Sequence, residues 1–362
     1  MNSGASRPGR VPARLAPSFV KRPWGSLDLT SLFPKRPREE KPIGEAWLTG
    51  DDSVFATGAF AGRTLGEIWP ALPEEWTGTR LTGLPRIPLL VKFIFPEDKL
   101  SVQVHPDDVY AEQHEAAAGG TGKTEMWYVV QAREGAEVLV GLRAKVARKS
   151  FERAVVDGTV EELLVTVPVR VGDAVFVPAG TVHTIGPGVV LCEIQQHSDI
   201  TYRVFDYNRL GLDGKPRELH IRQALDVIHF GDAAEAGGGL CDPVRITRGA
   251  VAKTFYAACR HFATERWEFS ERIAAVTSPE HFDLLIVLDG GGRLEFADGS
   301  EAYGPAEAWL LPAALGAYQL APDQPEKPTT LLRTYVPDLH GFVQRLTDDR
   351  VEEAAWSRVV HP

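Results

Sequence analysis

Short apolar runs interrupted by glycine, proline and aspartate are the feature that most restricts how this chain of 362 residues can fold. The clearest runs cover residues 138–140, 163–167, 174–177 and 189–194. They are rich in valine and other residues that favour strands, and they are short for helices. Several short strands at close spacing are typical of an antiparallel sandwich or barrel. We therefore expect a mainly β protein with a few helices.

One segment has a clear helical pattern. Residues 217–230 place four apolar side chains at i, i+3, i+4 and i+7, namely Ile221, Ala224, Leu225 and Ile228. This spacing predicts an amphipathic helix. A glycine-rich stretch at 236–239 follows it and predicts a flexible connection, where we place a domain boundary.

A repeated pattern indicates that the two parts of the chain share one kind of fold. Residues 175–179 are Val-Phe-Val-Pro-Ala, and residues 309–313 are Trp-Leu-Leu-Pro-Ala. The strand and turn patterns before these segments also follow the same order, which suggests an internal repeat. We predict a disordered tail over residues 1–18, a first barrel with its connecting helix over 19–235, and a second barrel over 236–362.

Composition narrows the possible partners. The formal net charge is −10, which argues against non-specific binding to nucleic acid or to membrane surfaces. Cys192, Cys241 and Cys259 are few and widely spaced, so they form neither a disulfide framework nor a metal knuckle. A reducing cytoplasm fits best. An anionic small molecule would need lysine and arginine gathered locally against this net charge.

Polar residues in a short valine-containing strand give the first possible metal ligands. Gln103 and His105 are two residues apart in Ser-Val-Gln-Val-His-Pro, so on a strand they share one face. If that face lines a barrel, both side chains enter one cavity. The alternative is a strand whose polar residues face water.

A second segment carries a more specific signal. Residues 172–183 have the spacing G-x5-P-x-G-x2-H, in which a strand enters, proline and glycine turn the chain, and His183 begins the return strand. This spacing matches the second motif of the cupin superfamily, whose jelly-roll barrels hold metals. The alternative is a buried histidine with a structural role.

The third element is a carboxylate. Glu125 lies between Lys123 and the apolar run Met-Trp-Tyr, where a carboxylate is costly unless it is paired or bound to a metal. The alternative is a surface ion pair with Lys123. Together, Gln103, His105, Glu125 and His183 offer two nitrogens and two oxygens, which suits Zn²⁺, with Mn²⁺, Fe²⁺ or Co²⁺ as alternatives. The set lacks a thiolate, which favours a working site over a structural one.

These motifs, taken in order, resemble those of the type I phosphomannose isomerases, particularly their short bacterial branch. The resemblance spans roughly residues 20–340. The matching stretches lie at residues 23–25, 43–47, 99–108, 122–128, 178–183, 201–207 and 217–220. Two departures from longer family members are the sequence Thr-Gly-Lys-Thr before Glu125 and the lack of room for an inserted helical domain.

The resemblance implies what the protein binds and does. It implies one Zn²⁺ per chain, held by the four ligands named above, and interconversion of mannose 6-phosphate and fructose 6-phosphate. It implies that Arg203 is the active-site arginine and that Lys123 and Glu193 line the sugar-phosphate pocket. We add Ser101 and Asp199, from the matching region, as substrate-binding residues. We expect a cytoplasmic monomer or homodimer whose partner is a hexose phosphate, with neither nucleic acid nor membrane.

The repeat implies that the second barrel lacks a metal. Ala317 follows Pro312 at the distance at which His183 follows Pro178, and Phe282 falls near the position of Glu125. Neither alanine nor phenylalanine can bind a metal, so we expect this barrel to serve as a scaffold.

Isomerisation through a cis-enediol needs a base that moves a proton between C2 and C1 of the sugar. Glu193 is our first choice, because a carboxylate in an apolar strand can have a raised pKa. Lys123 is the alternative base, and Glu193 is alternatively a strand-end carboxylate paired with an arginine. Two other functions stay open at this point: a non-catalytic sugar-binding cupin and a metal-dependent cupin dioxygenase.

Overall fold

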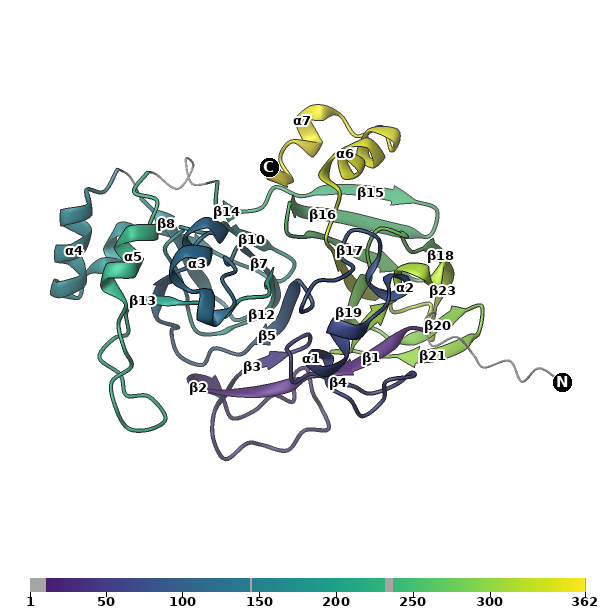
Figure 1. Ribbon diagram of the computed structural model, residues 1–362, viewed down its shortest axis with the longest axis horizontal. Coiled ribbons are helices and arrows are strands. Elements are labelled where there is room, and N and C mark those ends of the chain that lie inside the picture. The colour runs from purple at the N-terminus through teal and green to yellow at the C-terminus, as the bar shows by residue number, and fades with distance from the viewer. Residues whose placement is uncertain (1–10, 144, 232–236, 362) are drawn as a thin grey trace. The chain divides into compact units, whose positions relative to one another are not determined.

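The computed structural model describes residues 11–143, 145–231 and 237–361, and Figure 1 shows it as a ribbon. These residues form two compact units. The first barrel comprises the described residues of 19–47 and 90–241. The second barrel comprises those of 11–18, 48–89 and 242–361. The prediction of a mainly β protein with two barrels and few helices is confirmed.

The first barrel is built from two sheets and five helical segments among its described residues. The larger sheet has the order β14 (Gly239–Leu240), β10 (Ala174–Val177), β7 (Glu125–Ala132), β12 (Val189–Gln196), β5 (Leu89–Ile94), β3 (Ile43–Trp47), β2 (Ser18–Ser26). The smaller sheet has the order β13 (Tyr202–Phe205), β6 (Val102–Val104), β11 (His183–Ile185), β8 (Glu137–Leu142), β9 (Leu164–Pro168). The helical segments are α3 (Asp108–His114), η2 (Ala116–Ala118), α4 (Arg148–Asp157), η3 (Val160–Leu163) and α5 (Ile221–Val227).

An apolar core joins these two sheets. Trp127 and Val129 of β7 pack in one cluster with Val138 and Val140 of β8, and all four side chains are fully or almost fully buried. Residues two apart on a strand share a face, so each strand contributes alternate side chains to this core. The neighbouring positions on β7 and β12 are also buried, which leaves few water-exposed sites on these strands.

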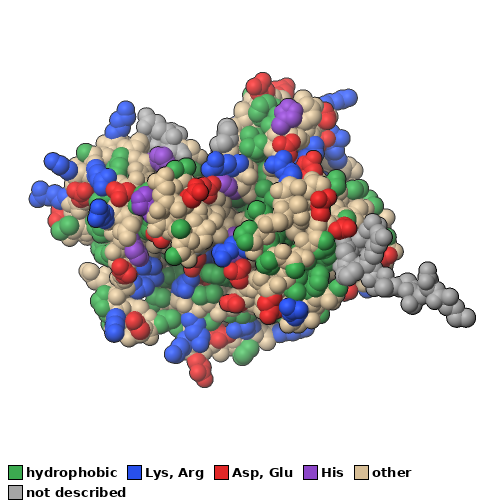
Figure 2. Space-filling model, in the orientation of Figure 1, with side chains coloured by type: hydrophobic (Ala, Val, Ile, Leu, Met, Phe, Trp, Pro, Cys, Tyr) green, Lys and Arg blue, Asp and Glu red, His purple; other side chains and the backbone are tan. Residues whose placement is uncertain are grey.

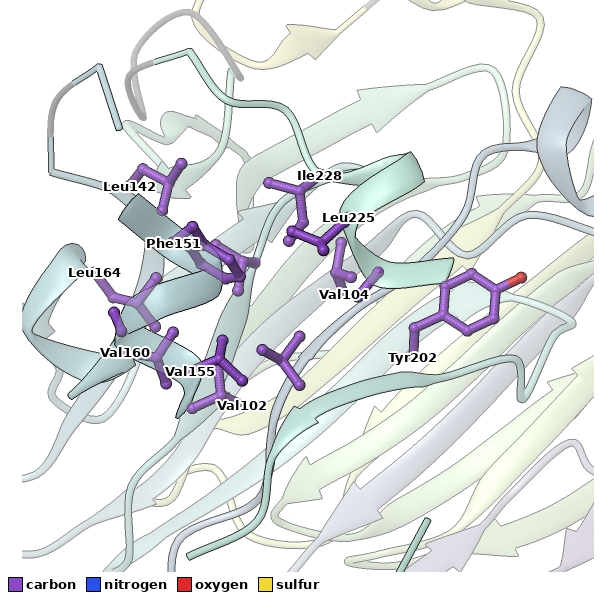
Figure 3. Packing of buried hydrophobic residues seen from close by; sticks show 14 of the residues in the cluster. Val102, Val104, Leu142, Phe151, Val155, Val160, Leu164, Tyr202, Leu225 and Ile228 are labelled. Atoms are coloured by element: carbon purple, nitrogen blue, oxygen red, sulfur yellow. The ribbon is translucent and has the colours of Figure 1, made fainter. Parts of the chain in front are cut away.

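Helices α4 and α5 cover the outer face of the smaller sheet. Figure 3 shows Phe151 of α4 and Leu225 of α5 gathered with Val102 and Val104 of β6 in one apolar cluster. Deleting a large buried side chain such as Phe151 typically costs about 3–5 kcal/mol of folding free energy. This packing holds β6, the strand that carries Gln103, firmly in place.

The second barrel is also built from two sheets. Its larger sheet has the order β15 (Val244–Arg248), β16 (Val251–Cys259), β17 (Ala263–Phe269), β24 (Thr329–Tyr335), β19 (Asp283–Asp289), β22 (Ala308–Leu311), β1 (Ala13–Ala16), β4 (Val54–Phe55), with β25 (Val360–His361) beside β16. Its smaller sheet has the order β18 (Ile273–Val276), β23 (Ala317–Pro322), β20 (Gly292–Phe296), β21 (Gly299–Tyr303). The helical segments are α1 (Leu65–Ile68), η1 (Trp69–Ala71), α2 (Glu74–Thr77), η4 (Ala313–Leu315), α6 (Leu339–Asp348) and α7 (Glu353–Trp356).

The strand orders of the two larger sheets correspond. The run β10-β7-β12-β5-β3 in the first barrel has the same pattern of sequence order as β22-β19-β24-β17-β16 in the second. The segments 175–179 and 309–313, whose similarity suggested a repeat, include β10 and β22, which occupy the same place in this order.

The structure corrects the predicted domain boundaries. Residues 13–16, predicted to be part of a disordered tail, form β1 and pair with β22 of the second barrel, where Ala13 opposes Leu310. Ala13 and Leu15 are 1% and 2% exposed, so burial of alternate apolar side chains holds this strand. Residues 48–89 likewise group with the second barrel, and Trp69 packs edge-on against Phe282. Residues 1–10 and 232–236, on which the other parts of these predictions fall, lie outside the described residues.

The predicted helix over 217–230 is shorter than expected. Helix α5 covers only Ile221–Val227, because both flanks bond to the barrel instead. The His220 N–H donates to the carbonyl oxygen of Arg203 at 2.8 Å, and the His229 N–H donates to that of Gly180 at 2.9 Å. The predicted apolar face is nevertheless used, since Ala224, Leu225 and Ile228 are buried.

Two further observations concern the surface. On the face shown in Figure 2, basic and acidic side chains are interspersed, so the net charge of −10 is not gathered into one patch of that face. Among the described residues, the helices are too short or too polar for any of them to cross a membrane.

Candidate metal centre and pocket of the first barrel

Strand pairing brings three predicted ligands together inside the first barrel. His183 on β11 lies opposite Gln103 on β6, while Glu125 begins β7 in the larger sheet. The ligand atoms of His105, Glu125 and His183 all lie within 4.8 Å of one another. These three side chains are 1%, 0% and 0% exposed, which excludes the alternative that they are surface groups.

A tight turn positions two of these histidines. Gly180 has a φ of +83°, and a Cβ at this position would lie 2.1 Å from the ring of His229, so only glycine fits. The Gly180 N–H donates to the carbonyl oxygen of His105 at 2.8 Å. The turn that starts the strand of His183 is therefore bonded directly to the backbone of His105.

Backbone carbonyls orient both imidazole rings. Nδ1 of His105 lies 2.8 Å from the carbonyl oxygen of Ile200, and Nδ1 of His183 lies 2.9 Å from that of Thr181. Because a carbonyl only accepts, each Nδ1 carries the proton and donates it. Each Nε2 then presents a lone pair, and both Nε2 atoms lie 3.4 Å from oxygens of Glu125. Such carbonyl partners are the usual way in which proteins fix metal-binding histidines.

Burial also keeps these rings neutral, as metal binding requires. Desolvation lowers the pKa of His105 well below its ordinary value, and Lys123 adds to the effect. Desolvation lowers the pKa of His183 to about 4. At neutral pH both imidazoles are therefore unprotonated ligands.

Gln103 lies beside this cluster. Its Nε2 is 3.3 Å from Nε2 of His183, and its Oε1 accepts a hydrogen bond from Ser101 Oγ at 3.2 Å. Rotating the amide by 180° exchanges its oxygen and nitrogen, which turns the oxygen toward the imidazoles and lets Ser101 accept from the amide. The donor set of two imidazoles, one carboxylate and one amide oxygen fits a divalent metal such as Zn²⁺.

Lys123 supplies positive charge at the same place. Its ammonium donates to Glu125 and lies 3.0 Å from Nε2 of His105. The segment before β7 packs closely against residues 107–108 at Gly122, where a Cβ would lie 2.6 Å from backbone atoms of Asp107 and Asp108. Glu125 is thus a buried carboxylate that requires a cationic partner.

A cavity of about 520 Å³ opens beside the cluster. Six of the residues singled out in the sequence line this cavity: Ser101, Gln103, Lys123, Glu193, Asp199 and Arg203. One of them, Gln103, is also a proposed metal ligand. They come from segments up to about a hundred residues apart, so the barrel brings them into one place. Of its charged lining residues, six are lysine or arginine and four are aspartate or glutamate. The net charge of the lining is therefore positive, whereas that of the whole chain is negative.

Glu193 lies at the inner end of this cavity and is only 4% exposed. Its carboxylate is 3.3 Å from Nζ of Lys92 and 3.9 Å from Nζ of Lys123, and it accepts a hydrogen bond from Trp127 Nε1. Desolvation raises the pKa of Glu193, although Lys123 partly offsets the rise. The partners of Glu193 are lysines, which departs from the expected alternative of an arginine pair.

Lys92 is a pocket residue whose role the sequence motifs did not reveal. Its ammonium is 3% exposed and lies 3.6 Å from Glu45 and 3.7 Å from Asp199, in addition to Glu193. Burial opposes its charge, but Glu45 and Glu193 outweigh that effect and raise the pKa of Lys92. The sequence feature that could have revealed Lys92 is its place inside the apolar run 89–95, because a buried lysine needs acidic partners.

Glu45 completes this network of charges. It accepts a hydrogen bond from Arg22 Nε at 2.7 Å. Burial alone would raise the pKa of Glu45, but Lys92 and Arg22 outweigh it and lower that pKa to about 2. The stretches at 23–25 and 43–47, quoted for the family resemblance, border the pocket through Pro23, Trp24 and Glu45.

Arginines gather at the outer part of the cavity. Arg203 donates through Nη1 to the carbonyl oxygen of Glu218 at 3.0 Å, whereas its Nε has no hydrogen-bond partner among the described residues. Burial, and then repulsion by Arg217, lower the pKa of Arg203. Asp206, 5% exposed, binds both Arg209 and Arg217 and so fixes the position of Arg217 at the cavity.

Comparisons with known proteins show which family this chain is similar to. Residues 13–134 match the family model described as phosphomannose isomerase type I, catalytic domain. A mannose-6-phosphate isomerase of Streptococcus mutans is 34% identical over 316 residues, which cover 86% of this chain and 96% of that protein. Mannose-6-phosphate isomerase ManA of Bacillus subtilis is 33% identical over 313 residues, covering 85% and 95%. A crystal structure of the mannose 6-phosphate isomerase from Bacillus subtilis superposes with a TM-score of 0.80 at 29% identity, covering 90% of this chain and 99% of that chain.

Proposed function

This chain belongs to the type I phosphomannose isomerase family, and from that premise we propose that it interconverts mannose 6-phosphate and fructose 6-phosphate through a cis-enediol. The observation that carries the proposal is the buried cluster of His105, Glu125 and His183 beside a cavity with an excess of basic side chains. A site of this kind suits a small anionic sugar.

Gln103, His105, Glu125 and His183 are the residues that would hold the metal, which we propose to be one Zn²⁺ per chain. When bound there, the metal supplies a Lewis acid that polarises the sugar oxygens on which charge develops. The second barrel contributes no equivalent set of ligands in this proposal.

Proton transfer falls to the side chains at the inner end of the cavity. We assign the base to Glu193, whose carboxylate lines the cavity near the ligand cluster. Lys92 at 3.3 Å stabilises its charged form, and Trp127 Nε1 orients it. Lys123 is the alternative base, because its ammonium also lines the cavity. A base in this position can reach both C1 and C2 of one bound sugar, which a cis-enediol route requires.

Binding of the phosphate falls to Arg203 and the basic side chains around it. Arg203 lines the cavity, and its planar guanidinium can bind two oxygens of an anion. Arg22 and Arg217 line the same cavity and raise the local positive potential. Asp199 and Ser101, also in the lining, offer acceptor and donor groups to sugar hydroxyls.

The experiment is a substrate panel of hexose 6-phosphates with the zinc-loaded protein, coupled to detection of fructose 6-phosphate. We expect turnover of mannose 6-phosphate that is lost in Glu193→Gln and retained in Glu97→Gln, a change of the same kind at an exposed glutamate outside this cavity. Loss in Lys123→Met together with full activity in Glu193→Gln would transfer the role of base to Lys123.

Other outcomes would point to another class of protein. Binding of hexose phosphates without turnover would make the protein a sugar-binding cupin. Oxygen consumption that depends on the metal would instead make it a dioxygenase.

A further inference from the structure

The second barrel keeps the frame of the metal centre but changes its side chains. In the first barrel, Val177 of β10 opposes Glu125 of β7. In the second barrel, Leu311 of β22 opposes Asp283 of β19. Val177 and Leu311 each precede the proline of the repeated segment, so Asp283 is the counterpart of Glu125. The predicted counterpart, Phe282, is wrong by one residue. Two residues before each of these strands' first residues, His281 replaces Lys123.

The other ligand positions follow from the smaller sheets. His183 opposes Gln103 between β11 and β6, and Ala317 opposes Val276 between β23 and β18. Ala317 is therefore the counterpart of His183, as the sequence predicted. Val276 replaces Gln103, and two residues further along Ser278 replaces His105. Of the four ligand positions only Asp283 retains a metal-binding side chain.

The buried charges are inverted as well. Glu193 opposes Trp127, two residues after Glu125, and Arg333 opposes Leu285, two residues after Asp283. An arginine thus takes the place of the proposed base. Arg333 donates to Glu265 at 2.6 Å and to Asp283 at 3.0 Å, so this barrel neutralises its own buried carboxylate without a metal.

A cavity of about 400 Å³ lies over these replaced positions. Four of its lining side chains are counterparts of the metal-site and pocket residues: Val276, Ser278, His281 and Arg333. Lys253 of β16 and Arg345 of α6 line it too. The second barrel has therefore kept a pocket where the first barrel has its active site.

The charges of this pocket are not balanced within the chain. Its acidic lining residues are already paired, Glu265 with Arg333 at 2.6 Å and Asp349 with Arg248 at 2.6 Å. Lys253 and Arg345, in contrast, have no acidic partner among the described residues. Lys253 lies 4.2 Å over the ring of Trp267, and Arg345 donates to the hydroxyl of Tyr335 at 3.1 Å.

Arg345 is exposed at the rim of the chain's surface, whereas Lys253 is partly buried, and the surroundings of Lys253 favour a negative ligand. Desolvation lowers the pKa of Lys253, although Glu265 partly offsets the effect, which means that its charged form lacks compensation. Inside the barrel, Arg333 Nε also has no hydrogen-bond partner among the described residues. A partly buried lysine without an acidic partner in a cavity wall therefore indicates a negative ligand.

We propose that this cavity of the second barrel binds a small oxyanion, an organic phosphate or carboxylate, between Lys253 and Arg345. The hydroxyl of Ser278 offers a further hydrogen-bond donor at the cavity wall. The aromatic ring of Phe255, also in the lining, can cover the carbon part of such a ligand. The site is separate from the proposed active site, since its lining residues belong entirely to the second barrel.

The test is calorimetric titration of the full-length, zinc-loaded protein with inorganic phosphate and, separately, with citrate. The double variant Lys253→Met/Arg345→Met removes both cations and keeps the apolar stems. Arg293→Met removes an exposed charge from the same barrel outside the cavity and is the matched control. Binding in the first barrel is common to all variants, so differences between them report on the second cavity.

We expect the double variant to lose one binding event or to bind at least about 10-fold more weakly, the range for lost charged hydrogen bonds. Ser278→Trp, which fills the cavity without changing its charge, should have the same effect. Arg293→Met should bind like the wild type, and isomerase activity should be unchanged in all variants. Binding of phosphate alone or citrate alone would each support the proposal and identify the ligand class. Equal binding by the wild type and the double variant, or no binding to the wild type beyond the first barrel, would overturn it.

Discussion

The two barrels share one strand order and bury opposite charges at corresponding positions. In the first barrel, Glu193 lies beside Lys92 and Lys123, the second of which also contacts the ligand cluster. In the second, Arg333 at the same register lies between Glu265 and Asp283. One arrangement leaves ligands available for a metal, and the other neutralises its carboxylate internally. The comparison teaches that function here depends on a few side chains, because the same strand order accommodates both a set of metal ligands and an internally neutralised carboxylate.

The largest expected effect comes from exchanging a carboxylate for an amide in each barrel. Glu125→Gln should weaken metal binding and lower kcat by more than about 1,000-fold, because it removes the charged ligand and with it several kcal/mol of Lewis-acid stabilisation. Asp283→Asn, the same change at the corresponding position, should leave both metal content and kcat unaltered. Elemental analysis and the coupled assay measure the two quantities. Full turnover of Glu125→Gln after dialysis against a chelator would show that Glu125 is no ligand.

A smaller effect should appear in the pH dependence of folding. The folded pKa of Glu45 is about 2, below its ordinary value of 4.5, so Glu45 stabilises the protein above pH 4.5 and loses this contribution as the pH falls toward 2. The difference corresponds to about 3 kcal/mol in the free energy of unfolding. Urea unfolding should show wild type more stable than Glu45→Gln by about this amount at pH 7, with the gap closing toward pH 2. A gap that stays constant with pH would contradict the assignment of the charge network.

Arginines in the two barrels provide the next comparison. Arg203→Lys keeps the charge but loses the planar fork, which should lower kcat/KM by about 10- to 150-fold, or about 1.5–3 kcal/mol. We expect the loss mainly in kcat, as for a group that acts on the enediolate. Arg333→Lys, in the second barrel, should reduce stability and leave kcat unchanged. Wild-type kinetics in both Arg203→Lys and Arg203→Ala would make Arg203 a structural residue.

The sequence pointed to the proposed metal ligands through motifs that are each local. The turn of residues 172–183 fixes a strand, a glycine turn and a histidine within twelve positions, and the structure places that histidine opposite Gln103. Alternation along a strand was enough to predict that Gln103 and His105 share a site. Both predictions depend on chain geometry over a few residues.

The network around Lys92 could not be predicted in this way. Its partners Glu45, Glu193 and Asp199 come from segments distant in sequence, and only the strand order of the sheet brings them to one place. The same reason explains residues 13–16, whose partner strand β22 lies almost 300 residues further along the chain. The placement of the counterpart of Glu125 near Phe282 has another cause. Counting residues along a weak repeat aligned the two barrels one residue away from the alignment that strand pairing gives, which is Asp283.

The central claim is that the first barrel alone holds a catalytic metal, and the number of tightly bound metal ions per chain tests it most directly. Elemental analysis of the purified protein should give one zinc per chain for the wild type and for Asp283→Asn, and none for His183→Ala, which removes a buried imidazole at the centre of the cluster. Two tightly bound metals per wild-type chain, or full occupancy in His183→Ala, would contradict the account.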